Sequence, residues 1–146
     1  MDILFTIFSF LVAITVLVGF HELGHFLVAR FFGVKILTFS IGFGKPIYSI
    51  GDGVDQTKFS LGAIPLGGYV KMLDESDNPS PDEMERTFSH KPAWQKILIA
   101  LAGPVANFIL TFVLFAFVFI ASDVSLKPVL GEPKADSILH SVGLRG

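Results

Sequence analysis

The stretch "GFHELGHFLVAR", residues 19–30, decides how the rest of the chain is interpreted. It places two histidines and a glutamate at the end of a run that is otherwise apolar. No charged residue occurs from Ile3 to Phe20, and with its continuation to Ala29 the run is long enough to cross a hydrocarbon core of about 30 Å. An ionisable side chain inside such a span is costly, so three of them within five positions indicate a functional site.

The composition is that of a membrane protein. Of the 146 residues, 51% are hydrophobic, 16 are Phe and only 16% are charged, with a mean hydropathy of +0.65. Residues 97–121 form a second charge-free run, so the sequence predicts two transmembrane helices. A cleaved signal peptide is the alternative for the first run. Asp2 and the absence of Lys or Arg before residue 30 disfavour it.

The positions of the basic residues predict the orientation. Arg30 borders the first apolar run, and Lys91 and Lys96 border the second, so we expect the connecting loop to be cytoplasmic and both ends to lie outside. The chain has no cysteine, which excludes disulfides and thiolate zinc sites. A net charge of −2 gives no indication of nucleic-acid binding. The expected surroundings are the lipid bilayer.

The spacing of the polar residues in the first run is that of a zinc motif. His21 and His25 are four residues apart and lie on one face of a helix, with Glu22 about 100° round from His21. Two imidazoles in this arrangement hold Zn²⁺, and the glutamate takes a proton from a water molecule whose pKa zinc lowers to about 7. A chance match, or polar residues that only join helices, is the alternative. The position inside a span favours the metal site.

Four stretches, in order, carry a family resemblance: "HELGHFLVAR", "FSIGFGKPIYS", "IPLGGYVKMLDE" and "LAGPVANFILTFVLF". With them the chain resembles the N-terminal part of the site-2 proteases, intramembrane zinc metalloproteases, and most closely the bacterial regulator-of-sigma-E type. The resemblance implies a multi-pass protein of the bacterial inner membrane. It implies cleavage of a single-pass transmembrane substrate, such as an anti-sigma factor, in or near its membrane segment. His21 and His25 would be the zinc ligands and Glu22 the catalytic base.

Asn107 is the one amide in the second apolar run. At 1.5 Å per helical residue, Glu22 lies roughly 12 Å inward from Arg30 and Asn107 roughly 16 Å inward from Lys96, so the two share a similar depth. In the resembled family this asparagine belongs to a motif that lines the catalytic cavity, and we therefore predict that Asn107 binds substrate. The alternative is a helix-packing hydrogen bond that contributes about 1 kcal/mol.

The loop between the two runs has the alternation of β-strands. Apolar and small or polar residues alternate over 37–43 and 58–63, and turn residues occur at 44–46, 51–53 and 65–68. We expect three or four short strands in a membrane-associated, re-entrant sheet. An open strand edge could hold an unwound substrate by strand addition. A purely structural hairpin domain is the alternative.

The fold class expected from these features is membrane α-helical with a small β element. The predicted parts are a transmembrane helix with the zinc motif (1–30), a β-sheet loop (31–75), a cytoplasmic linker and interfacial segment (76–96), a second transmembrane helix (97–121), and an extracytoplasmic linker (122–146) that resembles the beginning of a PDZ domain.

The predicted ligand set is incomplete. A catalytic zinc takes three protein ligands, and only His21 and His25 lie at the right depth. Asp123 lies at the other end of the second run, and His90 and His140 are expected in solvated loops. The resemblance implies an aspartate from a later span, beyond residue 146. We therefore expect these residues alone to be an inactive fragment. A metal-handling membrane protein and a noncatalytic membrane scaffold stay open as alternatives.

Overall fold

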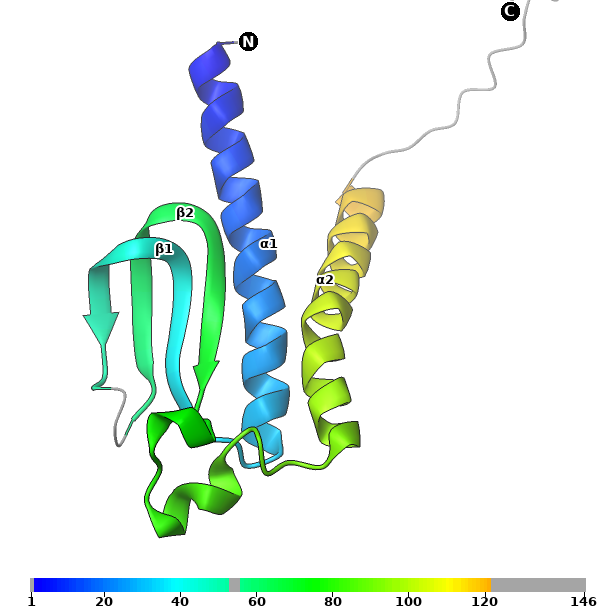
Figure 1. The fold of residues 1–146 in the computed structure, drawn as a ribbon. Helices are drawn as coiled ribbons and strands as arrows, with labels where there is room; N and C mark the ends of the chain where they lie inside the picture. The colour runs from blue at the N-terminus through cyan, green and yellow to red at the C-terminus, as the bar shows by residue number, and fades with distance from the viewer. Residues whose placement is uncertain (1, 53–55, 122–146) are drawn as a thin grey trace, which may run out of the picture. The chain divides into compact units, whose positions relative to one another are not determined.

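The computed structural model of the chain describes residues 2–52 and 56–121. The chain divides into two compact units, residues 1–113 and 114–146. The predicted PDZ-like beginning, with Asp123 and His140, lies outside the described residues. The elements are α1 (Ile3–Phe31), β1 (Ile36–Ile50), β2 (Lys58–Met72), the short 3-10 helices η1 (Glu75–Asp77) and η2 (Pro81–Arg86), and α2 (Ala93–Ala121) (Figure 1).

Both long helices have the length and composition of a membrane span. Each contains 29 residues, which corresponds to about 44 Å of helix. α1 reaches one residue beyond the predicted span, and α2 begins four residues before it, at Ala93. Gly33 ends the helical region of α1 with a φ of 72°, a left-handed conformation that glycine adopts without steric cost. Two apolar helices that flank a small sheet in the sequence agree with the predicted membrane fold.

The sheet differs from the three or four short strands that were expected. It has two antiparallel strands of 15 residues each, and each strand is bent so that four segments lie side by side in the order 68–72, 36–41, 58–61 and 46–50. The predicted turns at 44–46 and 65–68 lie inside the strands. Glycine explains the difference, because Gly42 and Gly44, with φ of 87° and 84°, let β1 bend and continue through the expected turn.

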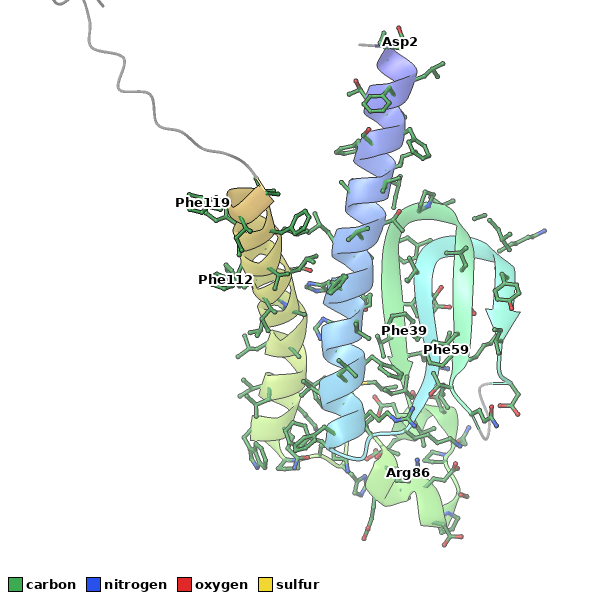
Figure 2. The ribbon with its side chains drawn as sticks, turned by 180° about the vertical axis from the view of Figure 1, so that it is seen from behind. Asp2, Phe39, Phe59, Arg86, Phe112 and Phe119 are labelled. Atoms are coloured by element: carbon green, nitrogen blue, oxygen red, sulfur yellow. The ribbon has the colours of Figure 1, made fainter. Side chains whose placement is uncertain are left out.

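The core lies where the sheet packs on α1. Phe26 of α1 meets two sheet residues, with ring centroids 5.5 Å from Phe39 and 5.8 Å from Phe59. Figure 2 shows Phe39 and Phe59 at the same level of the sheet. Ala29 of α1 and Ile99 of α2 are almost completely buried. In both views α1 lies between the sheet and α2 (Figures 1 and 2). This arrangement places the part of α1 that carries His21, Glu22 and His25 between the sheet and α2.

The segment between the sheet and α2 is held by a short backbone ladder. Lys35 N donates to Arg86 O over 2.9 Å, Leu73 N donates to Lys35 O over 2.8 Å, and Phe88 N donates to Leu73 O over 2.8 Å. Thr87 is fully buried beside this ladder and donates its hydroxyl to the Met84 carbonyl. The ladder fixes η2 against the end of α1 that carries Arg30.

Candidate metal centre

The two long helices touch where Gly24 of α1 meets the small residues Ala102 and Ala106 of α2. A Cβ on Gly24 of α1 would overlap with the Ala102 carbonyl oxygen of α2 and lie 2.8 Å from Ala106 Cβ. The helix backbones therefore approach as closely as small residues in membrane helices allow. The neighbouring side chains of α1, His21 and His25, are brought directly against α2.

The imidazoles of His21 and His25 converge on one small space. Their ring centroids are 4.9 Å apart with an edge-on geometry. A Cβ on Gly103 of α2 would lie 2.7 Å from His21 Nε2 and would overlap with His25 Nε2. Both Nε2 atoms therefore lie against α2 at Gly103, where any side chain would displace the two rings.

The orientation of His25 is fixed by the backbone of α2. His25 Nδ1 lies 2.7 Å from the Ile99 carbonyl oxygen, so Nδ1 carries the proton and donates it. In the neutral ring this leaves the lone pair of Nε2 free for a metal. Gly103 lies one helical turn after Ile99, and its missing side chain leaves that carbonyl accessible. No sequence pattern marks a backbone carbonyl as a partner, so sequence reasoning missed this contact.

Asn107 lies beside His21, at the depth that the helix geometry predicted. Its Nδ2 is 3.4 Å from His21 Nδ1, a long contact, and its Oδ1 is buried without a hydrogen-bond partner among the described residues. A rotation of the amide by 180° would bring Oδ1 to His21 Nδ1, where it would accept the Nδ1 proton. His21 Nε2 would then be unprotonated, as a metal ligand must be. The unpartnered oxygen favours this orientation once a metal is bound.

Glu22 lies against the sheet. It lines a cavity of 290 Å³ together with His21, Asn107 and the bend of the sheet, and the other lining residues are Leu17, Val18, Phe43, Gly67 and Gly68. A Cβ on Gly68 would lie 3.0 Å from Glu22 Cγ, so the beginning of the last sheet segment runs directly past the carboxylate side chain. Glu22, His21 and strand β2 of the sheet therefore all border the same cavity.

The residues present fit zinc in part. His21 Nε2 and His25 Nε2, which meet at Gly103, would provide two nitrogen ligands. Within residues 2–52 and 56–121 no group of three or more His, Cys, Asp or Glu side chains is arranged to hold a metal ion. His90 lies elsewhere, 3.3 Å from Glu75 Oε1. A third ligand is therefore needed in addition to the described residues.

Comparison with known proteins gives the chain a family. The sequence model of peptidase family M50 matches residues 9–142. RSc1411 of Ralstonia nicotianae, named as a candidate zinc metalloprotease, is 46% identical over 148 residues, which cover 96% of this chain and 32% of that protein. Regulator of sigma-E protease RseP of Escherichia coli is 45% identical over 139 residues, covering 94% of this chain and 31% of that protein. Protease RseP of Yersinia pestis is 42% identical, with the same coverage of both chains. The chain spans about a third of the length of these relatives.

Proposed function

The chain belongs to peptidase family M50, the site-2 proteases, and we propose that it carries the zinc motif of an intramembrane metalloprotease that hydrolyses peptide bonds in or near transmembrane segments. His21 and His25 hold the zinc through Nε2, and Glu22 is the general base. An aspartate outside the described residues supplies the third ligand. The protein lies in the bacterial inner membrane with the loop at 31–96 on the cytoplasmic side.

The proposal rests most directly on the convergence of the two Nε2 atoms beside Gly103. When bound, zinc supplies Lewis-acid chemistry, since it lowers the pKa of water to about 7 and polarises a carbonyl group. The carboxylate of Glu22 accepts the proton of the attacking water and returns it to the leaving amine. The Ile99 carbonyl holds the His25 ring, and Asn107 holds the His21 ring.

The sheet gives the site a way to hold an extended substrate. A transmembrane substrate arrives as a helix and must be unwound before a carbonyl carbon can be attacked. The segment 68–72 pairs with β1 on one side only among the described residues, and its first residue, Gly68, lies against Glu22. A substrate strand added at this edge would place its backbone in the 290 Å³ cavity. The substrate class is a single-pass membrane protein such as an anti-sigma factor.

The roles of Glu22 and His21 are separable by experiment. In the full gene product, Glu22→Gln should abolish cleavage of a transmembrane substrate and leave zinc bound, because the glutamate moves a proton and does not hold the metal. His21→Ala should lose both zinc and activity. The measurements are zinc content by metal analysis and cleavage in reconstituted vesicles. Equal loss of zinc in the two variants would contradict the assignment of Glu22.

The same two measurements separate the remaining classes of function. A metal-handling membrane protein would bind zinc and show no cleavage of any transmembrane substrate. A noncatalytic scaffold would show neither stoichiometric zinc nor cleavage. The protease alone predicts one zinc per chain together with cleavage that depends on Glu22.

A further inference from the structure

A second cavity lies at the end of α1, away from the metal centre. It has a volume of 570 Å³, within the range of small-molecule sites. Its walls come from three places: the end of α1 at Arg30, the neighbouring ends of the two strands at Ile50 and Phe59, and the end of η2 at Arg86. The metal-centre residues do not line it, so it requires a separate explanation.

The polar wall of this cavity carries positive charge. Arg30, Lys35 and Arg86 all line it. Lys35 is neutralised, because its Nζ lies 2.5 Å from Glu83 Oε1. Arg30 and Arg86 are exposed and make no ion pair with any residue in the described ranges. Two arginines thus line the cavity without an acidic partner in that part of the chain. Figure 2 shows Arg86 at the end of the unit where α1 ends.

A further cation and one acid lie near the rim. Lys91 Nζ is 3.9 Å from the position that a Cβ on Gly33 would occupy, and Gly33 lines the cavity. Asp52, next to the lining residue Gly51, accepts a hydrogen bond from Gln56 N over 3.2 Å. The charge close to the cavity is therefore positive on balance among the described side chains.

The strand side of the cavity exposes two large apolar residues beside Gln56 and Thr57. Ile50 and Phe59 line it, and their side chains are 58% and 46% exposed. Val34 and Ile36 also line the cavity and are buried. A ligand that fills this cavity must therefore present both an anionic group and an apolar group. A free inorganic anion would interact with the arginines and leave the apolar residues without a partner.

The position of Arg30 along α1 indicates where such a ligand would come from. Arg30 lies in the last turn of an apolar 29-residue helix, where the acyl chains of a bilayer give way to headgroups. Arginines bind phosphate through two parallel hydrogen bonds, and basic pockets at the cytoplasmic ends of membrane helices bind anionic headgroups. We propose that this cavity binds one anionic phospholipid, with its phosphate between Arg30 and Arg86 and an acyl chain against Ile50 and Phe59.

Bound lipid would join α1, the sheet and η2 at one point. The backbone of Arg86 is tied to Lys35 by the hydrogen bond from Lys35 N, and Arg30 lies one turn from the core residue Phe26, with its guanidinium carbon 5.9 Å from the Phe26 ring centroid. The lipid therefore bridges elements that are already ordered, and it needs no rearrangement of the backbone. Its binding depends on membrane insertion and not on zinc.

The test measures binding of short-chain lipids to the purified chain in a neutral detergent, by native mass spectrometry and calorimetry. Dioctanoyl phosphatidylglycerol should bind with a stoichiometry of one, and dioctanoyl phosphatidylcholine should bind at least about tenfold more weakly. The double variant Arg30→Gln, Arg86→Gln should weaken phosphatidylglycerol binding roughly 25-fold, about fivefold for each guanidinium. Lys45→Gln removes one positive charge elsewhere on the sheet and should change nothing.

Three results would overturn the proposal. Equal binding of the two lipids by the wild-type chain would show that the charge is not recognised, and this comparison needs no variant to fold. Glycerol 3-phosphate that binds as tightly as phosphatidylglycerol would show a site for a soluble phosphate instead. Unchanged binding in the double variant, with unchanged helix content by circular dichroism, would place the lipid elsewhere. Restored binding in Arg30→Lys, Arg86→Lys would support the charge-based assignment.

Discussion

The helix contact at Gly24 and Gly103 and the charged end around Lys35 and Arg86 are built in opposite ways. The helix contact depends on small residues that let the helices approach, and a ring nitrogen of each histidine has a defined partner on α2. The charged end depends on exposed ion pairs such as Lys71 with Asp77, where the hydrogen bond from Lys71 lowers the pKa of the aspartate. Exposed pairs contribute little free energy because water screens them. Single substitutions should therefore have large effects at the helix contact and small effects at the charged end.

The largest effect is expected from Gly103→Ala. The new Cβ would clash with both Nε2 atoms and displace the two rings, so zinc affinity should fall by more than about 100-fold while helix content is retained. The matched control is Gly19→Ala on α1, where a Cβ meets only Ile41 Cδ1 at 3.4 Å. Zinc affinity is measured by competition with a chelator in detergent. Equal zinc affinities of Gly103→Ala and Gly19→Ala would show that the helix contact is no more sensitive than its surroundings.

A smaller effect is expected from Asn107→Ala. Loss of the amide leaves the His21 ring without its partner, so metal affinity should fall about 10- to 100-fold. The absorption spectrum of bound Co²⁺ should also change, which a loss of stability alone would not produce. Thr111→Val, one turn further along α2 and in a cavity that Asn107 also lines, is the control. An unchanged spectrum in Asn107→Ala would restrict the asparagine to helix packing.

Proline in the edge segment tests the sheet as a substrate platform. Neighbouring residues in an antiparallel strand alternate between N–H groups that face the partner strand and N–H groups that face away. One of Tyr69→Pro and Val70→Pro should therefore disturb the pairing with β1, and the other should remove only an outward donor. The second should reduce cleavage about five- to tenfold without a change in Tm. Full cleavage activity in the variant that keeps its Tm would leave the sheet with a structural role.

The smallest effect is expected at the charged end. The hydrogen bond from Lys35, helped by hydrogen bonds from Ser80, lowers the pKa of Glu83 from 4.5 to about 2. Because the folded-state pKa lies below the ordinary value, the pair stabilises the fold above about pH 4.5, and this contribution is lost as the pH falls from there toward 2. Glu83→Gln should flatten the dependence of Tm on pH in this window. Glu85→Gln, which removes a carboxylate of the same short helix, should leave the dependence unchanged.

The helices were predictable from sequence and the sheet only in outline. A run of apolar residues as long as residues 3–29 has few alternatives to a membrane helix, whereas a strand can bend at Gly42 and continue, so turn residues did not end β1 where expected. The motif spacing placed His21 and His25 on one face. The Ile99 carbonyl and the pairing of Arg30 with Arg86 around one cavity arise from tertiary packing, which no local pattern records.

The most direct test of the central claim, that the two histidines of α1 hold zinc through Nε2 against α2, is zinc X-ray absorption of the full gene product. We expect two imidazole nitrogens at about 2.0–2.1 Å from the metal in the wild-type protein. His21→Ala and His25→Ala should each remove one of these nitrogens from the spectrum of whatever zinc remains bound. An imidazole contribution that is identical in the wild type and in both variants would contradict the account, because the zinc would then be held by residues other than His21 and His25.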